Sequence, residues 1–123
     1  MPGVALPGTA GSVLIFRLLS GPLRAMAKDR HVEAFLEALE NERNLSPRTI
    51  ENYRHALTMF RSSGNRPAWR DCTADDFRAY LFEMMKNNVA RATVRLHFAA
   101  FRTFYKFLVE RFGFKNNPMK DVL

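Results

Sequence analysis

Cysteine is nearly absent from this chain of 123 residues, which contains only Cys72. A single thiol cannot form a disulfide within the chain and has no second thiol with which to build a zinc site. The three histidines, His31, His55 and His97, lie on separate segments without a carboxylate or cysteine at ligand spacing, so we expect no metal site. Such sparse cysteine is typical of a reducing compartment, and we expect a cytoplasmic protein.

Long apolar runs and glycine-rich loops are missing as well. The apolar run VLIFRLL at residues 13–19 is too short to span a bilayer and is interrupted by Arg17, so a membrane is not an expected partner. Without a glycine-rich phosphate loop there is no support for a bound nucleotide, and we expect no cofactor. No segment alternates polar and apolar residues as a half-buried strand does, and the chain is therefore predicted to be all-α.

Acidic residues are absent from residues 1–25, which are rich in glycine, proline and small side chains. We interpret residues 1–25 as a flexible or partly helical arm. Residues 26–123 are predicted to form one compact domain, because the chain is too short for two well-packed ones. Over the whole chain 19 lysines and arginines stand against 12 acids, a formal net charge of +7, which favours a polyanionic partner.

Apolar residues recur at steps of three and four in four segments, which predicts four helices. The first helix is predicted over residues 30–43, with Asp29 as its N-cap. The second begins at Ser46, a favourable N-cap, followed by Pro47 at the first helical position, and runs to about residue 62.

The third predicted helix starts after Thr73, with Asp76 as the partner in a capping box. Its buried stripe is expected to comprise Phe77, Tyr80, Leu81, Met84 and Met85. The fourth helix is predicted over residues 91–112 and ends at Gly113, the usual residue for a left-handed cap. Its apolar residues cover an arc of about 200°, too wide for contact with one neighbour, so we expect this helix at the centre of the bundle.

Two large polar or aromatic side chains are interpreted as parts of the core. Trp69, in the long connection before the third helix, is predicted to fold back as a lid. His97 falls inside the apolar arc of the fourth helix and is interpreted as a packed, hydrogen-bonded residue.

Charge is sorted by helix. On the second helix Arg48, Asn52 and His55 cluster on the side opposite the apolar stripe. On the fourth helix four bases lie within about 60° of one another and form a stripe about 20 Å long. These bases are Arg91, Arg95, Arg102 and Lys106. The first and third helices are net acidic, and because charge that serves only solubility would not be divided in this way, the pattern favours nucleic acid as the partner.

The chain resembles the N-terminal core-binding domain of the tyrosine recombinases, the Xer and phage-integrase group, over about residues 30–123. The resemblance lies in three stretches in the same order and spacing: ERNLSPRTIENYRHAL, TADDFRAYLFEMM and ATVRLHFAAFRTFYKFLVERFGFKNNP. It implies a four- to five-helix orthogonal bundle of the SAM-like type that clamps one face of double-stranded DNA. A separate C-terminal domain, expected beyond Leu123, would cut the DNA from the other face.

The function implied by the resemblance is DNA binding in a site-specific recombinase or integrase, taking part in DNA integration and recombination. The full-length protein would self-associate on DNA, and no residue of this chain is expected to be catalytic. In the family the second and fourth helices lie against the DNA, and its Ser-x-x-Thr helix start falls on Ser46 and Thr49. The expected DNA-binding residues are Ser46, Arg48, Thr49, Asn52, His55, Arg91, Thr93, Arg95, Arg102 and Lys106.

The sequence departs from the family pattern at two places. FAAFR replaces a leucine-rich stretch of the fourth helix, so Phe98 and Phe101 are expected to enlarge the core. No glycine separates the third and fourth helices, where Asn87 and Asn88 are instead able to adopt a left-handed turn at modest cost.

Two other functions are compatible with the sequence. Tyr53, Tyr80 and Tyr105 would be the nucleophiles if the chain itself cleaved DNA, but all three lie on or beside apolar stripes and we interpret them as core residues. The alternative function is a helical protein-interaction or oligomerisation domain of a recombination complex, in which the apolar residues 13–19 dock on a neighbouring molecule.

Overall fold

Residues 29–122 are described by the computed structural model, and over this range the chain forms helices and irregular connections without a strand. The elements are α2 (Arg30–Asn41), α3 (Pro47–Ser62), the 3-10 helix η2 (Trp69–Asp71), α4 (Ala74–Lys86), α5 (Arg91–Phe112) and the 3-10 helix η3 (Pro118–Asp121). The predicted all-α fold is confirmed over this range. The predicted arm at residues 1–25 lies outside the described residues, so the division into arm and domain stays a prediction.

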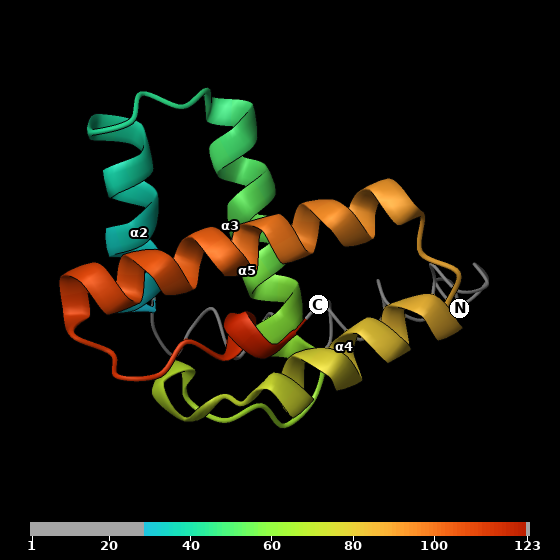
Figure 1. Cartoon of the computed structure of the whole chain (residues 1–123). Helices are drawn as coiled ribbons and strands as arrows, with labels where there is room; N and C mark the ends of the chain where they lie inside the picture. The colour runs from blue at the N-terminus through green and yellow to red at the C-terminus, as the bar shows by residue number, and fades with distance from the viewer. Residues whose placement is uncertain (1–28, 123) are drawn as a thin grey trace.

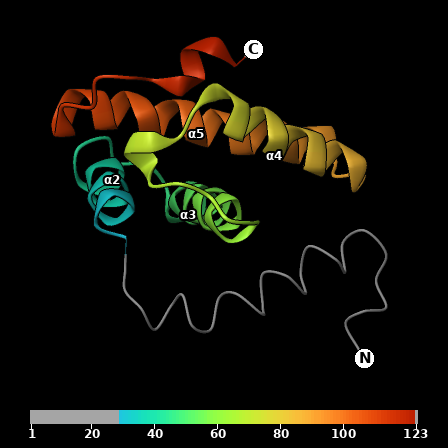
Figure 2. The same cartoon turned by 90° about the horizontal axis from the view of Figure 1, so that it is seen from below.

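The helices pack around α5. α2 and α3 lie side by side as an antiparallel pair, and α5 crosses both at a steep angle (Figure 1). Figure 2 shows α2 and α3 nearly end-on, on one side of α5, with η3 on the opposite side. α4 lies below α5 in Figure 1 and leads into it through a short turn. The part of the circumference of α5 that these elements leave uncovered faces solvent.

Side chains cap three of the helices where the sequence predicts caps. The carboxylate of Asp29 accepts two backbone N–H groups from the first turn of α2. The hydroxyl of Ser46 accepts the N–H of Thr49 at 3.2 Å and starts α3. At the start of α4, Thr73 and Asp76 each accept a hydrogen bond from the backbone N–H of the other, which completes the predicted capping box.

Two predicted left-handed residues end the last two helices. Gly113 follows α5 with φ of 67°, and Asn88 follows α4 with φ of 60°. Asparagine tolerates this conformation better than most residues with a Cβ, because its short side chain can hydrogen-bond locally. The absence of a glycine before α5 is therefore compatible with a tight turn.

α2 is shorter than predicted: it ends at Asn41 rather than at residue 43. The chain winds tightly after this point, with Asn44 at a φ of 54°. The N–H of Leu45 then bonds back to the carbonyl of Leu39 at 3.1 Å. This closure points the chain toward α3 and leaves no room for another helical turn.

α5 supplies the centre of the core, as its wide apolar arc predicts. Five of its side chains are fully buried, at 0 % exposure: Ala100, Phe101, Phe104, Tyr105 and Leu108. Phe60 of α3 stacks on Phe77 of α4 with ring centroids 4.4 Å apart. Trp69 is 4 % exposed and packs on Phe60 and Phe104, so its interpretation as a core lid is confirmed.

The predicted buried stripe of α4 is wrong at one position. Phe77, Tyr80 and Met84 are buried and Leu81 is half-buried, but Met85 is 63 % exposed. α4 packs along one side only, so its buried stripe is narrow, and Met85 lies about 100° around the helix from Met84. The neighbouring Phe82 is 62 % exposed for the same reason.

Candidate nucleic-acid interface

The start of α3 carries the first predicted site residues. The hydroxyl of Ser46 donates to the hydroxyl of Thr49 at 3.0 Å while it caps the helix, so the two side chains form one local unit. Arg48 lies between them in the sequence and is exposed. The first turn of α3 therefore presents two hydroxyl groups and one guanidinium to solvent or to a ligand.

The polar stripe of α3 leads from this turn to the point where α3 crosses α5. Arg48, Asn52 and His55 lie within about 60° of one another around the helix axis. Arg48 and His55 are exposed, and Asn52 is half-buried. The ring of His55 meets the ring of His97 on α5 edge-on, with centroids 6.0 Å apart. The stripe thus runs along the N-terminal half of α3 to its contact with α5.

The basic residues of α5 face another direction. All four are exposed: Arg91, Arg95, Arg102 and Lys106. They lie about 120–180° around the helix from His97, which faces α3 and α4. Thr93, also exposed, lies only about 40° from His97. The structure therefore brings Thr93 together with the stripe of α3, and turns the four bases of α5 away from the helix crossing.

The acids of α2 do not neutralise the predicted site. Glu33 pairs with Arg54 at 2.6 Å, and Glu42 pairs with Arg111. Neither arginine belongs to the predicted set. Within residues 29–122 no ion pair engages any of the five predicted cations, Arg48, Arg91, Arg95, Arg102 and Lys106. Their charges are available to a partner.

The N-termini of α3 and α5 add to the positive electrostatic potential of these two helices. The first turns of α2 and α4 contain acids, whereas those of α3 and α5 contain none. The N-cap of α5 is Ala90, which offers no side-chain hydrogen bond to the free N–H groups of the first turn. Because a helix N-terminus carries a partial positive charge, these two termini favour anions such as phosphate.

Three arginines that raise the charge of the segment around α3 have structural roles instead. The guanidinium of Arg61 lies 4.1 Å from the ring centroid of Trp69 and donates to two carbonyl groups of the following loop. Arg66 lies over the ring of Phe60, and Arg70 over that of Phe114. Sequence reasoning missed these contacts. The sequence did contain a signal for them. The loop after α3 is irregular and contains proline, so its carbonyl groups need hydrogen-bond donors, and aromatic residues lie nearby in the sequence.

His97 and Tyr80 form a buried pair under the helix crossing. The hydroxyl of Tyr80 lies 2.9 Å from Nδ1 of His97. Burial, and then the neighbouring His55, lower the pKa of His97 to about 4, while burial raises the pKa of Tyr80. The interpretation of His97 as a packed, hydrogen-bonded residue is confirmed. A hollow of about 340 Å³ adjoins this pair, with Thr93 on its wall.

The tyrosines are part of the core, as predicted. The hydroxyl of Tyr105 donates to the carbonyl of Trp69 at 2.7 Å, and burial raises the pKa of Tyr105. Tyr53 is half-buried, and its ring stacks parallel to that of Phe35. At Tyr80 and Tyr105 the raised pKa and the burial are opposite to what an activated nucleophile requires.

The described residues offer neither a metal site nor a membrane span. In residues 29–122 no three histidine, cysteine or acidic side chains come close enough to hold a metal ion. Over the same range none of the helices combines the length and the apolar character needed to cross a membrane.

Comparisons with known proteins agree with this architecture. The family model of the phage integrase, N-terminal SAM-like domain matches residues 32–111. Tyrosine recombinase XerC of Roseiflexus castenholzii is 38% identical over 97 residues, which cover 76% of this chain and 31% of the relative. Tyrosine recombinase XerC of Pelotomaculum thermopropionicum is 36% identical over 100 residues, covering 75% of this chain and 33% of the relative.

A third relative, tyrosine recombinase XerC of Shigella dysenteriae serotype 1, is 33% identical over 94 residues, covering 74% of this chain and 32% of the relative. The chain thus spans about a third of the length of the curated relatives it matches. No solved structure matches the chain significantly. Because the family match extends from α2 to the end of α5, the chain belongs to the family of phage integrase N-terminal SAM-like domains, found in tyrosine recombinases.

Proposed function

We propose that this chain binds double-stranded DNA as the N-terminal clamp domain of a site-specific tyrosine recombinase or integrase. The observation that carries the proposal is the placement of charge: five exposed cations without ion pairs in the described residues lie on α3 and α5, the two helices whose first turns lack acids. Exposed cations that contribute no ion pair to the fold are available to neutralise phosphates.

The duplex would contact the polar stripe on the N-terminal half of α3 and the exposed basic face of α5. The bases of α5 extend over about 22 Å, from residue 91 to residue 106. This length exceeds the width of the major groove, about 12 Å, so the stripe is long enough to reach phosphates on both sides of it. Arg102 and Lys106 are the proposed phosphate contacts. The proposed contacts to base edges are Arg48, Asn52, Arg91 and Arg95.

The remaining predicted residues have supporting places in this arrangement. Ser46 and Thr49, joined by their hydroxyl groups, are proposed to contact phosphate beside the N-terminus of α3. His55 and Thr93 lie near the crossing of α3 and α5, where we propose that they contact the duplex.

DNA cleavage is assigned to a part of the recombinase outside this chain. The buried hydroxyls of Tyr80 and Tyr105, each engaged in a hydrogen bond, support this assignment, and we propose that the chain itself is not an enzyme. The parent protein would take part in DNA integration and recombination and would self-associate on DNA.

A salt titration of binding to a duplex tests the proposal. If about five phosphates are neutralised, log K should fall with log salt at a slope of about −4 to −5. The triple variant Arg95→Ala, Arg102→Ala, Lys106→Ala should lose much of this slope. The triple variant Lys86→Ala, Lys115→Ala, Lys120→Ala removes the same charge from exposed positions away from α3 and α5 and should retain it. Equal slopes for both triple variants, or a flat response of the native chain, would reject the proposed face.

A second function, protein interaction within a recombination complex, is favoured by one observation. Phe82 and Met85 on α4 are 62 % and 63 % exposed, an unusual exposure for two large apolar side chains on one helix. If they form an interface, the variant Phe82→Ser, Met85→Ser should reduce the mass of any complex measured by sedimentation in the absence of DNA. An unchanged mass would remove this second function.

A further inference from the structure

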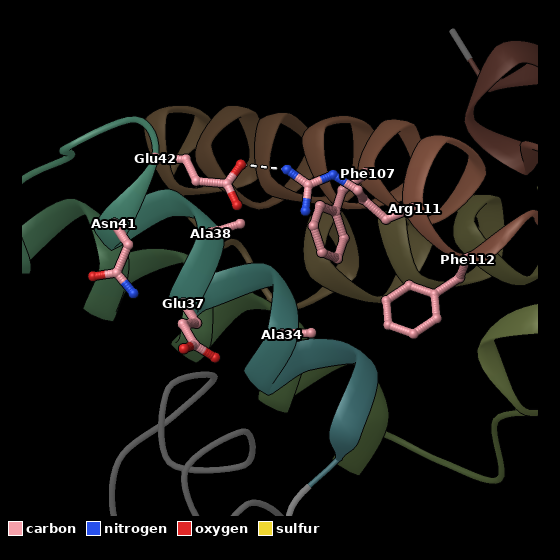
Figure 3. A pocket seen from close by; sticks show the side chains of 8 residues that line it. All are labelled: Ala34, Glu37, Ala38, Asn41, Glu42, Phe107, Arg111 and Phe112. Carbon is pink, nitrogen blue, oxygen red and sulfur yellow. Dashed lines mark hydrogen bonds and ion pairs between the residues drawn. The ribbon is translucent and has the colours of Figure 1, made fainter.

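A groove separates α2 from the C-terminal turns of α5, at the end of α5 opposite to Arg91. Its volume is about 360 Å³. Figure 3 shows Phe107 and Phe112 of α5 on one wall and Ala34 and Ala38 of α2 on the other. The lining is completed by Glu37, Asn41, Glu42 and Arg111.

The groove combines apolar walls with excess negative charge. Two alanines and two phenylalanines line it, so the groove can contact apolar side chains. At one end Glu42 pairs with Arg111, drawn as a dashed line in Figure 3. Glu37 is exposed and takes part in no ion pair within residues 29–122. A ligand for this groove should therefore be apolar with a single cation.

We propose that the groove is occupied by residues 13–19 of the same chain, VLIFRLL, with Arg17 beside Glu37. This proposal does not depend on DNA binding. Residues 1–28 contain Arg17, Arg24 and Lys28 and no acid, so their charge is opposite to that of the groove. Apolar residues flank Arg17 on both sides, with Ile15 and Phe16 before it and Leu18 and Leu19 after it, and they match the apolar walls of the groove.

The length of the connection permits this arrangement within one molecule. Residues 20–28 can span about 30 Å when extended. The groove is lined by α2 residues 34–42, which end about 20 Å along the helix from Asp29. At about the lower limit of ligand-pocket volumes, roughly 300–1,000 Å³, the groove accepts a few side chains of a segment rather than a folded partner.

The exposed apolar face of α4 is a poorer site for the same segment. Nζ of Lys86 lies 5.7 Å from the ring centroid of Phe82, so this face already carries a cation. For a segment whose only charges are positive, a face that carries Lys86 is less favourable than a groove that carries Glu37. The C-terminal end of α4 also lies far from α2, at the opposite end of the molecule in Figure 1.

Trypsin cleavage after Arg17 in the whole chain measures docking. The variant Ile15→Ser weakens the apolar contact without touching the described fold, and Glu37→Lys reverses the charge of the groove. We expect each to accelerate cleavage by about three- to tenfold, the order expected for losing one or two modest contacts. Glu83→Lys, on exposed α4, is the charge-matched control and should cleave at the native rate. Equal rates for all four chains would overturn the proposal.

Methyl NMR locates the docked segment. Ile15→Ser should shift the methyl resonances of Ala34 and Ala38 and leave that of Met85 unchanged; a shift at Met85 alone would place the segment on α4 and overturn the proposal. The double variant Arg17→Glu, Glu37→Lys should shift the alanine methyl resonances by less than the sum of the two single changes, because it restores opposite charges at the two positions. Shifts that depend on protein concentration would identify the segment of a second molecule as the occupant and would also overturn it.

Discussion

The hydroxyl of Tyr80 on α4 lies 2.9 Å from Nδ1 of His97 on α5, and the two rings stack with an interplanar angle of 10°. This pair joins α4 to α5 next to the point where His97 meets His55 of α3. It makes both side chains part of the support of the proposed DNA face rather than part of the face.

Tyr80→Phe should lower the free energy of unfolding by about 1–2 kcal/mol, because Nδ1 of His97 loses its partner in the core. Urea unfolding followed by circular dichroism measures the change. Tyr53→Phe is the matched control: Tyr53 is half-buried and its hydroxyl makes no hydrogen bond within residues 29–122, so its effect should stay below about 0.5 kcal/mol. Equal effects of the two substitutions would contradict a structural hydrogen bond at Tyr80.

Stability should fall in mild acid. Burial lowers the pKa of His97 from 6.5 to about 4, so the unfolded chain binds this proton more readily than the folded one. The contribution of His97 is present above about pH 6.5 and is lost as the pH falls toward about 4, amounting to about 2 kcal/mol between pH 7 and pH 5. Burial lowers the pKa of His31 too, which adds in the same direction. In His97→Gln the loss between pH 7 and pH 5, measured by urea unfolding, should be smaller; an identical loss would exclude His97 as its source.

Arg95→Ala should reduce the salt slope of DNA binding by about one and weaken binding by about 1–3 kcal/mol if Arg95 also reads a base. The exposed position of Arg95, without an ion pair in the described residues, predicts that stability stays within about 0.5 kcal/mol of native. Fluorescence anisotropy with a labelled duplex at several salt concentrations measures both quantities. Lys115→Ala is the control, and an equal loss there would show a nonspecific charge effect.

Arg61→Ala should act on the fold rather than on the DNA face. Loss of the stack on Trp69 and of two hydrogen bonds to loop carbonyls should cost about 1–2 kcal/mol of stability. The emission of Trp69, the only tryptophan of the chain, should shift to longer wavelength as its ring gains water. Under folded conditions the salt slope of DNA binding should be native, and a reduced slope would place Arg61 on the DNA face instead.

Gly113→Ala should destabilise the end of α5 by about 1–2 kcal/mol, since an alanine at a φ of 67° is strained. No atom lies within 4 Å of the position of an added Cβ, so the cost arises from the backbone alone. Gly113→Asn should cost less, because asparagine tolerates the left-handed region better. Thermal unfolding of the two variants compares them, and an equal cost would point to a steric cause.

Local signals in the sequence predict the helix starts well. The caps at Asp29, Ser46 and Thr73 are completed by groups two or three residues away, so their chemistry is readable along the chain. The early end of α2 and the exposure of Met85 were not predicted, because both depend on how far a neighbouring element extends.

The charged residues show the limit of counting along a sequence. Arg43 to Arg70 holds six bases against Glu51, which suggests one strongly cationic helix. In the structure Arg54 pairs with Glu33, 21 positions away, and Arg61, Arg66 and Arg70 lie over aromatic rings. Only their tertiary contacts distinguish these four arginines, which have structural roles, from Arg48, which has no ion pair within residues 29–122. The direction of the basic stripe of α5 likewise depends on the angle at which α5 crosses α3, which no local pattern encodes.

α3 and α5 meet through buried side chains such as Phe60 and Phe101, whereas the five predicted cations are exposed and enter no ion pair within residues 29–122. Side chains along the outer surface can therefore be exchanged without repacking the interior. A lineage carrying this domain is free to drift from one target sequence to another by changing only its outward residues, with the angle between the two helices inherited intact.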